Sequence, residues 1–125
     1  MNLRRLVPTL AVAGLLGACQ IGTYVNIGPG DDPPSVSLAA APSLASRGET
    51  IGLVAAAADD YRVVEVSFYR LDIGGTTLLG RDGSAPYAIE TVLPTGAAGE
   101  VRYIARATDD AGQVSESQTV SVAVR

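Results

Sequence analysis

The chain has 125 residues, with 13 acidic residues against nine arginines and a formal net charge of −4. It contains no histidine and no lysine, which excludes a Ser-His-Asp triad, histidine-bound zinc, a Ser-Lys dyad and Schiff-base catalysis. No pair of carboxylates stands out for glycoside hydrolysis, and an acidic surface repels phosphate backbones. We therefore expect no enzymatic activity, and no nucleic acid as a partner.

Residues 1–18 predict a secretory signal peptide. Two arginines near the start are followed by an apolar stretch from Leu6 to Leu16, and small residues come directly before Cys19. A membrane-spanning helix needs about 20 apolar residues. This stretch is shorter than that and contains Pro8. We expect the signal to be removed from the mature protein.

The segment Leu16-Gly17-Ala18-Cys19 resembles the lipobox of bacterial lipoproteins. The resemblance implies that cleavage precedes Cys19, that this residue is the lipidation site, and that it carries a diacylglycerol and an acyl chain such as palmitate. Several chains together anchor a protein stably in a membrane. Gln20 follows in place of aspartate, which by analogy with Gram-negative lipoproteins favours the outer over the inner membrane of the cell envelope. Plain secretion with a free cysteine is the alternative.

Residues 19–33 are rich in glycine, proline and aspartate. This composition predicts a flexible tether rather than a packed element. Fifteen extended residues reach at most about 50 Å. The tether is therefore long enough to hold a domain clear of lipid headgroups.

From residue 34 to residue 125, short segments alternate apolar and polar residues and are separated by turn residues. The alternation, without a helical segment, predicts an antiparallel all-β sandwich. We expect turns at Gly74-Gly75 and, as a hairpin, at residues 81–83. The apolar residues that alternate along the expected strands are Val36, Leu38, Ala40, Ile51, Leu53, Ala55, Ala57, Val64, Val66, Phe68, Val101, Tyr103, Ala105, Ala107, Val120, Val122 and Val124.

Several of these stretches, "VVEVSFYR" and "ARATDDAGQVSES" above all, resemble the bacterial immunoglobulin-like domains of exported proteins. The resemblance runs from about Pro33 to Arg125. It implies an immunoglobulin-like antiparallel β-sandwich of about seven strands with a non-catalytic structural or protein-interaction role. The partner is an unknown envelope protein or glycan. The alternative is a carbohydrate-binding or adhesion module, for which Tyr61 and Tyr69 are the candidate exposed rings.

The sequence contains one internal echo, "AAAADD" at residues 55–60 and "ARATDD" at residues 105–110. In an immunoglobulin-like sandwich these segments belong to strands in opposite sheets, with the alanines packed between the sheets. The turns that follow lie at one end of the domain. We therefore expect Asp59, Asp60, Asp109 and Asp110 to converge there, with Asp31 and Asp32 nearby.

Converging carboxylates repel one another unless a cation or hydrogen bonds offset their charge. Calcium is the candidate ion, because loop aspartates supply the oxygen ligands that it takes. The alternative is that these aspartates only accept hydrogen bonds from turn amides. The spacing of an extended calcium loop is absent from the sequence. No other cofactor is expected.

Overall fold

The computed structural model describes residues 31–125. The signal peptide, Cys19 and most of the predicted tether lie outside the described residues. Residues Asp32–Arg125 form one compact unit. Its nine strands are β1 (Ser35–Ala41), β2 (Leu44–Ala45), β3 (Thr50–Ala58), β4 (Val63–Asp72), β5 (Gly75–Asp82), β6 (Tyr87–Val92), β7 (Glu100–Asp109), β8 (Val114–Glu116) and β9 (Val120–Val124).

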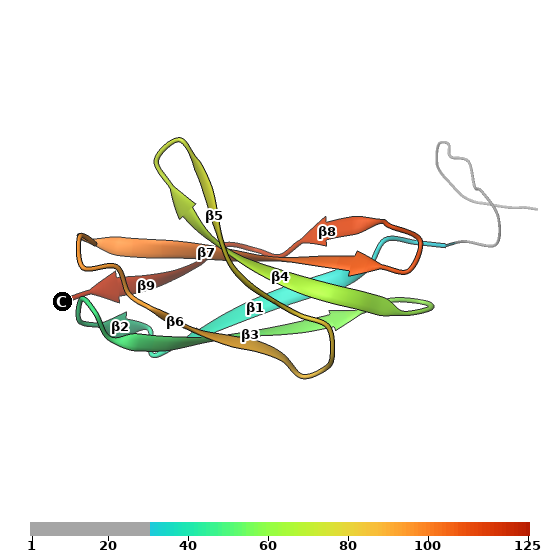
Figure 1. Cartoon of the computed structure of the whole chain (residues 1–125), viewed down its shortest axis with the longest axis horizontal. Helices are drawn as coiled ribbons and strands as arrows, with labels where there is room; N and C mark the ends of the chain where they lie inside the picture. The colour runs from blue at the N-terminus through green and yellow to red at the C-terminus, as the bar shows by residue number, and fades with distance from the viewer. Residues whose placement is uncertain (1–30) are drawn as a thin grey trace, which may run out of the picture. The chain divides into compact units, whose positions relative to one another are not determined.

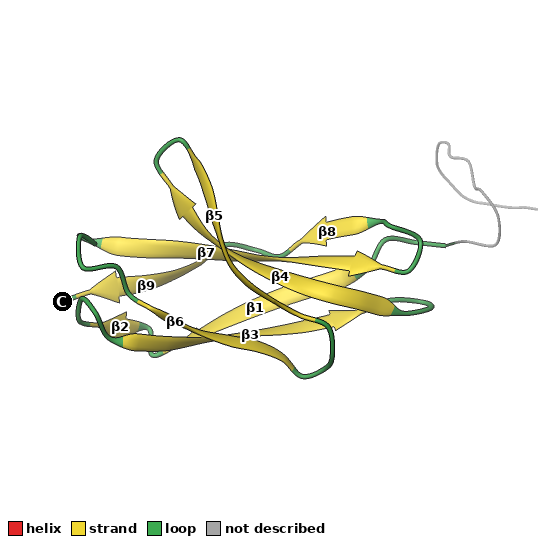
Figure 2. Ribbon diagram, viewed as in Figure 1, coloured by secondary structure: helices red, strands yellow, loops and turns green. Residues whose placement is uncertain are grey.

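The strands form two sheets that pack face to face (Figure 1). One sheet has three strands in the order β1-β3-β6, and the other has the order β2-β9-β7-β4-β5, with β8 also paired to β7. All pairs are antiparallel except β2 with β9, which is parallel. Strands and loops make up the described part of the chain, where no helix occurs (Figure 2).

The predicted all-β sandwich is therefore confirmed. The structure has two strands more than the expected number of about seven. The prediction missed β2 and β8, which span only two and three residues. Segments this short carry no readable alternation. Among residues 31–125, no helix is long and apolar enough to cross a membrane.

The core lies between the two sheets and contains most of the residues that the alternation picked out. The fully buried side chains include Phe68 and Tyr103 from the larger sheet and Ile51 and Leu53 from the smaller one. The other buried apolar members of this cluster are Leu38, Ala45, Ala55, Val66, Tyr87, Leu93, Val101, Ala105, Ala107 and Val122. Strand periodicity of two thus places one face of each sheet in the interior.

The prediction fails at Val64, which is 38% exposed. The pairing of β4 with β7 shifts register between Val63 and Glu65, which marks a bulge. A bulge inserts an extra residue and reverses the alternation locally. Val63 packs against the core instead.

The predicted hairpin at residues 81–83 is also wrong. Arg81 and Asp82 still belong to β5, which lies in the larger sheet. The next strand, β6, lies in the smaller sheet. The turn therefore carries the chain from one sheet to the other. Local turn residues do not distinguish a hairpin from such a crossing.

The echo between residues 55–60 and 105–110 has the expected structural basis. Strands β3 and β7 lie in opposite sheets. Ala55 is 4% exposed, and Ala105 and Ala107 are fully buried. Small side chains in the core let two sheets approach closely. After these alanines each strand ends, and each is followed by an acidic turn.

Candidate metal centre

The β3–β4 turn is held by the side chain of Asp59, the first residue after β3. Its Oδ2 atom accepts hydrogen bonds from the backbone N–H groups of Tyr61 and Arg62, both at 3.1 Å. Aspartate commonly closes turns in this way because its short side chain reaches amides two and three residues ahead. One carboxylate oxygen of Asp59 is thereby committed to the turn.

The β7–β8 turn repeats this arrangement with Asp109, the last residue of β7. Its Oδ1 atom accepts hydrogen bonds from the backbone N–H groups of Ala111, at 3.0 Å, and Gln113, at 2.7 Å. Gly112 has φ of +82°, a left-handed conformation that favours glycine. Asp109 is only 2% exposed. The sequence Asp-Asp-Ala-Gly-Gln thus forms a tight turn around a buried carboxylate.

The two turns lie side by side at the end of the sandwich where β1 begins (Figure 1). Val63 pairs with Asp109 in the ladder between β4 and β7. The backbone N–H of Asp110 donates to the carbonyl oxygen of Arg62 at 3.1 Å. Asp59 and Asp109 therefore face the same region from opposite sheets.

The carboxylates of Asp59 and Asp109 lie close together, with one oxygen of each within 4.8 Å of an oxygen of the other. Asp109 is buried, and Asp59 is half-buried. The arrangement concentrates negative charge at one point and is the best candidate metal centre of the described residues.

Two of the four predicted metal ligands lie outside this group. The Oδ2 atom of Asp60 accepts a hydrogen bond from the backbone N–H of Asp32 at 3.2 Å. Asp110 is exposed. In each Asp-Asp pair, the first residue turns inward and the second faces outward. Whether a metal ion binds stays a prediction.

Sequence reasoning missed Gln113. Its side-chain oxygen Oε1 is buried and, within residues 31–125, has no hydrogen-bond partner. Gln113 follows Asp109 by four positions in the same turn. Only the local Asp-x-x-x-Gln spacing pointed to it, and glutamine in a turn has many ordinary explanations. The predicted lipidation site, Cys19, lies outside the described residues.

The two tyrosines considered for sugar binding lie on different elements. Tyr61 is 59% exposed in the β3–β4 turn. Tyr69 lies within β4, and the Arg106 guanidinium covers its ring at 4.9 Å from the centroid. Six residues along a strand separate Val63 from Tyr69, which corresponds to roughly 20 Å. The two rings therefore do not form one flat platform.

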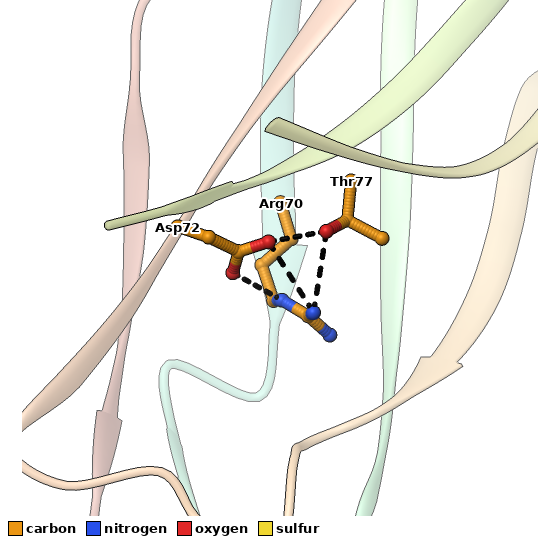
Figure 3. Close-up of polar contacts among 3 residues, drawn as sticks. All are labelled: Arg70, Asp72 and Thr77. Atoms are coloured by element: carbon orange, nitrogen blue, oxygen red, sulfur yellow. Dashed lines mark hydrogen bonds and ion pairs between the residues drawn. The ribbon is translucent and has the colours of Figure 1, made fainter. Parts of the chain in front are cut away.

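A second polar cluster occupies the β4–β5 hairpin, at the other end of β4 (Figure 3). The Nε atom of Arg70 donates to Oδ1 of Asp72 at 2.7 Å. The hydroxyl of Thr77 donates to the other carboxylate oxygen of Asp72. The hydrogen bond from Arg70, followed by that from Thr77, lowers the pKa of Asp72 below its ordinary value. This carboxylate is neutralised by the protein itself.

Comparisons with known proteins agree with the fold. The fibronectin(III)-like modules of Clostridium thermocellum CbhA match with a TM-score of 0.60 and 27% identity, over 72% of this chain and 94% of the module. The PKD domain of an M14-like peptidase from Thermoplasmatales archaeon SCGC AB-540-F20 matches with a TM-score of 0.53 and 18% identity, over 76% of this chain and 98% of that domain. No protein-family model and no curated protein matches the sequence.

These similarities support the immunoglobulin-like fold expected from the sequence. Fibronectin(III)-like and PKD domains are sandwich modules of a class that is typically non-catalytic. The fold is thus consistent with a structural or interaction domain. Because function is carried by particular sites and not by the fold, the acidic turns are the part of the domain with identifiable chemistry.

Proposed function

We propose that the protein is a lipid-anchored immunoglobulin-like module of the bacterial cell envelope with a non-catalytic structural or protein-interaction role. The observation that carries the non-catalytic part is the likeness to the CbhA fibronectin(III)-like modules, which extends over 94% of the module. The sandwich therefore corresponds to a whole module of that kind. The apolar residues that alternate along its strands pack in the core between the sheets.

The anchoring part of the proposal rests on the sequence around Cys19. A basic start, a short apolar stretch and Leu16-Gly17-Ala18-Cys19 occur in the order that lipoprotein signals require. Only cysteine supplies the thiolate nucleophile for the lipid transfer. Gln20 in place of aspartate favours the outer membrane. The module would then act by contacting an envelope protein or glycan.

Metabolic labelling tests the anchor directly. Cells that produce the full chain are fed an alkyne-bearing fatty acid, and the protein is purified in detergent and coupled to a fluorophore. We expect label on the wild type and none on Cys19→Ala, with the variant either uncut or released from the membrane. An unlabelled wild-type chain that is cleaved and released would overturn the anchor and leave plain secretion.

The interaction role requires a separate test. The anchored protein is crosslinked in intact cells, recovered in detergent and compared with Cys19→Ala produced at the same level. A lipid-dependent partner should be enriched only with the anchored form. Recovery of no envelope protein or glycan with the anchored form would contradict an interaction role at the envelope.

A further inference from the structure

We propose that the β3–β4 and β7–β8 turns bind one calcium ion through the carboxylates of Asp59 and Asp109. The proposal does not depend on lipid anchoring, because both residues lie within the sandwich. It goes beyond the module's general role by assigning a ligand to a defined pair of side chains.

The stronger support for the proposal comes from Asp109, and the weaker from Asp59. Its side chain is 2% exposed, and its Oδ1 atom already accepts two backbone hydrogen bonds. Its Oδ2 atom is buried and lacks a hydrogen-bond partner anywhere in the described part of the chain. Buried polar atoms are almost always satisfied, and an exception demands an explanation. A buried anionic oxygen without a partner is among the costliest exceptions.

Asp59 divides its two oxygens in the same way. Oδ2 holds the β3–β4 turn through Tyr61 and Arg62. Oδ1 is buried and, as far as residues 31–125 extend, has no hydrogen-bond partner. Each turn thus uses one carboxylate oxygen for itself and leaves the other without a donor. Such a repetition in two turns from opposite sheets favours a shared ligand over two separate accidents.

No side chain of the described residues neutralises this pair. The ion pairs found between residues 31 and 125 involve Asp72, Glu65, Glu116 and Glu49, and none involves Asp59 or Asp109. The two carboxylates lie within 4.8 Å of each other. Like charges this close repel, and a cation placed among them turns the repulsion into attraction.

Calcium fits the donor atoms better than zinc or magnesium. Every candidate ligand is an oxygen, whereas zinc sites are built mainly from cysteine and histidine. Calcium takes ligands at about 2.3–2.6 Å in flexible geometry, so oxygens on opposite sides of the ion are up to roughly 5 Å apart. The spacing of 4.8 Å or less agrees with this range. Magnesium demands shorter distances and a stricter octahedron.

The neutral oxygen of Gln113 lies in the same turn as Asp109. Amide carbonyls are regular calcium ligands, and calcium completes its shell with water. Within the part of the chain that the structure covers, this oxygen also has no hydrogen-bond partner. Ordered water at the buried oxygens is the competing explanation, and it predicts no response to calcium.

Calorimetry and thermal unfolding of the full chain in detergent test the proposal. The protein is stripped with chelator, dialysed, and titrated with calcium chloride, and unfolding is followed by circular dichroism. We expect heat of binding at a one-to-one ratio. At a calcium concentration ten times Kd, the unfolding midpoint should rise by about 5 °C or more. Sodium chloride at matched ionic strength should not reproduce the rise.

Isosteric variants locate the site. Asp59→Asn and Asp109→Asn keep an oxygen for the turn amides but remove the charge, and each should weaken calcium binding at least tenfold. Asp110→Asn is the matched control, since it makes the same change at an exposed neighbour and should bind like the wild type. Circular dichroism in chelator checks that each variant is folded.

Three results would overturn the proposal. The first is a wild type that gives neither heat of binding nor a higher unfolding midpoint with calcium, which would mean that water molecules bind these oxygens. The second is undiminished binding by Asp59→Asn and Asp109→Asn. The third is an equal loss in Asp110→Asn, which would indicate general screening of an acidic surface. None of these results bears on labelling at Cys19, so the two proposals fail independently.

Discussion

Two acidic sites lie at the two ends of strand β4, and their carboxylates differ in how many hydrogen-bond partners they have. At the end of β4 lies Asp72, whose two carboxylate oxygens are both partnered by Arg70 and Thr77 (Figure 3). At its beginning lie the turns of Asp59 and Asp109, where each carboxylate has one oxygen committed to the backbone and one buried without a partner among the described residues. An aspartate carboxylate therefore has partners for both oxygens at one end of β4 and for only one oxygen at the other end.

The difference shows that a carboxylate beside an arginine has partners for both oxygens, whereas a carboxylate held by turn amides has a partner for only one. Arg70 supplies a positive charge in a fixed fork, which suits a carboxylate. In the acidic turns, the hydrogen bonds to Asp59 and Asp109 come from backbone amides and reach only one oxygen of each. The contrast makes separate predictions for the two ends of β4.

The largest effect is expected at Asp109. Replacing Asp109 with alanine leaves the N–H groups of Ala111 and Gln113 without their acceptor, which lies 3.0 and 2.7 Å from them. Loss of a buried partner costs about 1–3 kcal/mol, so Asp109→Ala should lower the free energy of unfolding by that amount or more in the presence of calcium. Urea unfolding measures it. Asp110→Ala should change stability by less than about 0.5 kcal/mol, and an equal loss there would contradict the assigned role.

A smaller effect of opposite sign is expected at Tyr103. Its hydroxyl is buried and unpartnered within the described range, and burial raises the pKa of its phenol. Tyr103→Phe removes a desolvated group and breaks no hydrogen bond, so it should stabilise the domain by up to about 1 kcal/mol. Calcium should not alter this gain. A loss of stability in urea unfolding would show that the hydroxyl is satisfied.

The smallest effect is expected at Asp72 and depends on pH. Arg70 and Thr77 lower the pKa of Asp72 in the folded protein, whereas the unfolded value is about 3.9. The stabilisation is therefore present above pH 4 and is lost as pH falls through the lower, folded-state pKa. Asp72→Asn should be less stable than the wild type at pH 6. The gap between the urea midpoints of the two proteins should narrow as pH falls below 4, and a constant gap would refute the linkage.

The β-sandwich was predictable because alternation is a direct imprint of a two-faced sheet. Leu53, Phe68 and Val122 are all fully buried, as their positions in alternating segments indicated. The misses come from features that alternation does not record. A bulge moved Val64 outward, and the turn after Asp82 crosses between sheets. Both are decided by tertiary pairing rather than by local sequence.

The candidate metal centre was predictable in its location but not in its membership. The repeated Asp-Asp pairs marked the two turns, and the sandwich topology brought the turns together. Which member of each pair faces inward depends on where the strand ends: Asp109 is still within β7, and Asp59 directly follows β3. That one-residue detail separates Asp59 from Asp60. Sequence alternation alone does not fix strand ends to one residue.

The short parallel pair of β2 with β9 has a mechanical consequence. Strand β1 begins at one end of the sandwich and β9 finishes at the other (Figure 1). A tensile force between these ends pulls β2 and β9 along their length in opposite directions. The bonds from Ala123 N–H to Ser43 O at 2.8 Å and from Arg125 N–H to Ala45 O at 3.0 Å lie across that direction. Both bonds are loaded in shear and share the force. The β2–β9 pair therefore resists stretching as a unit, and its bonds do not break one at a time.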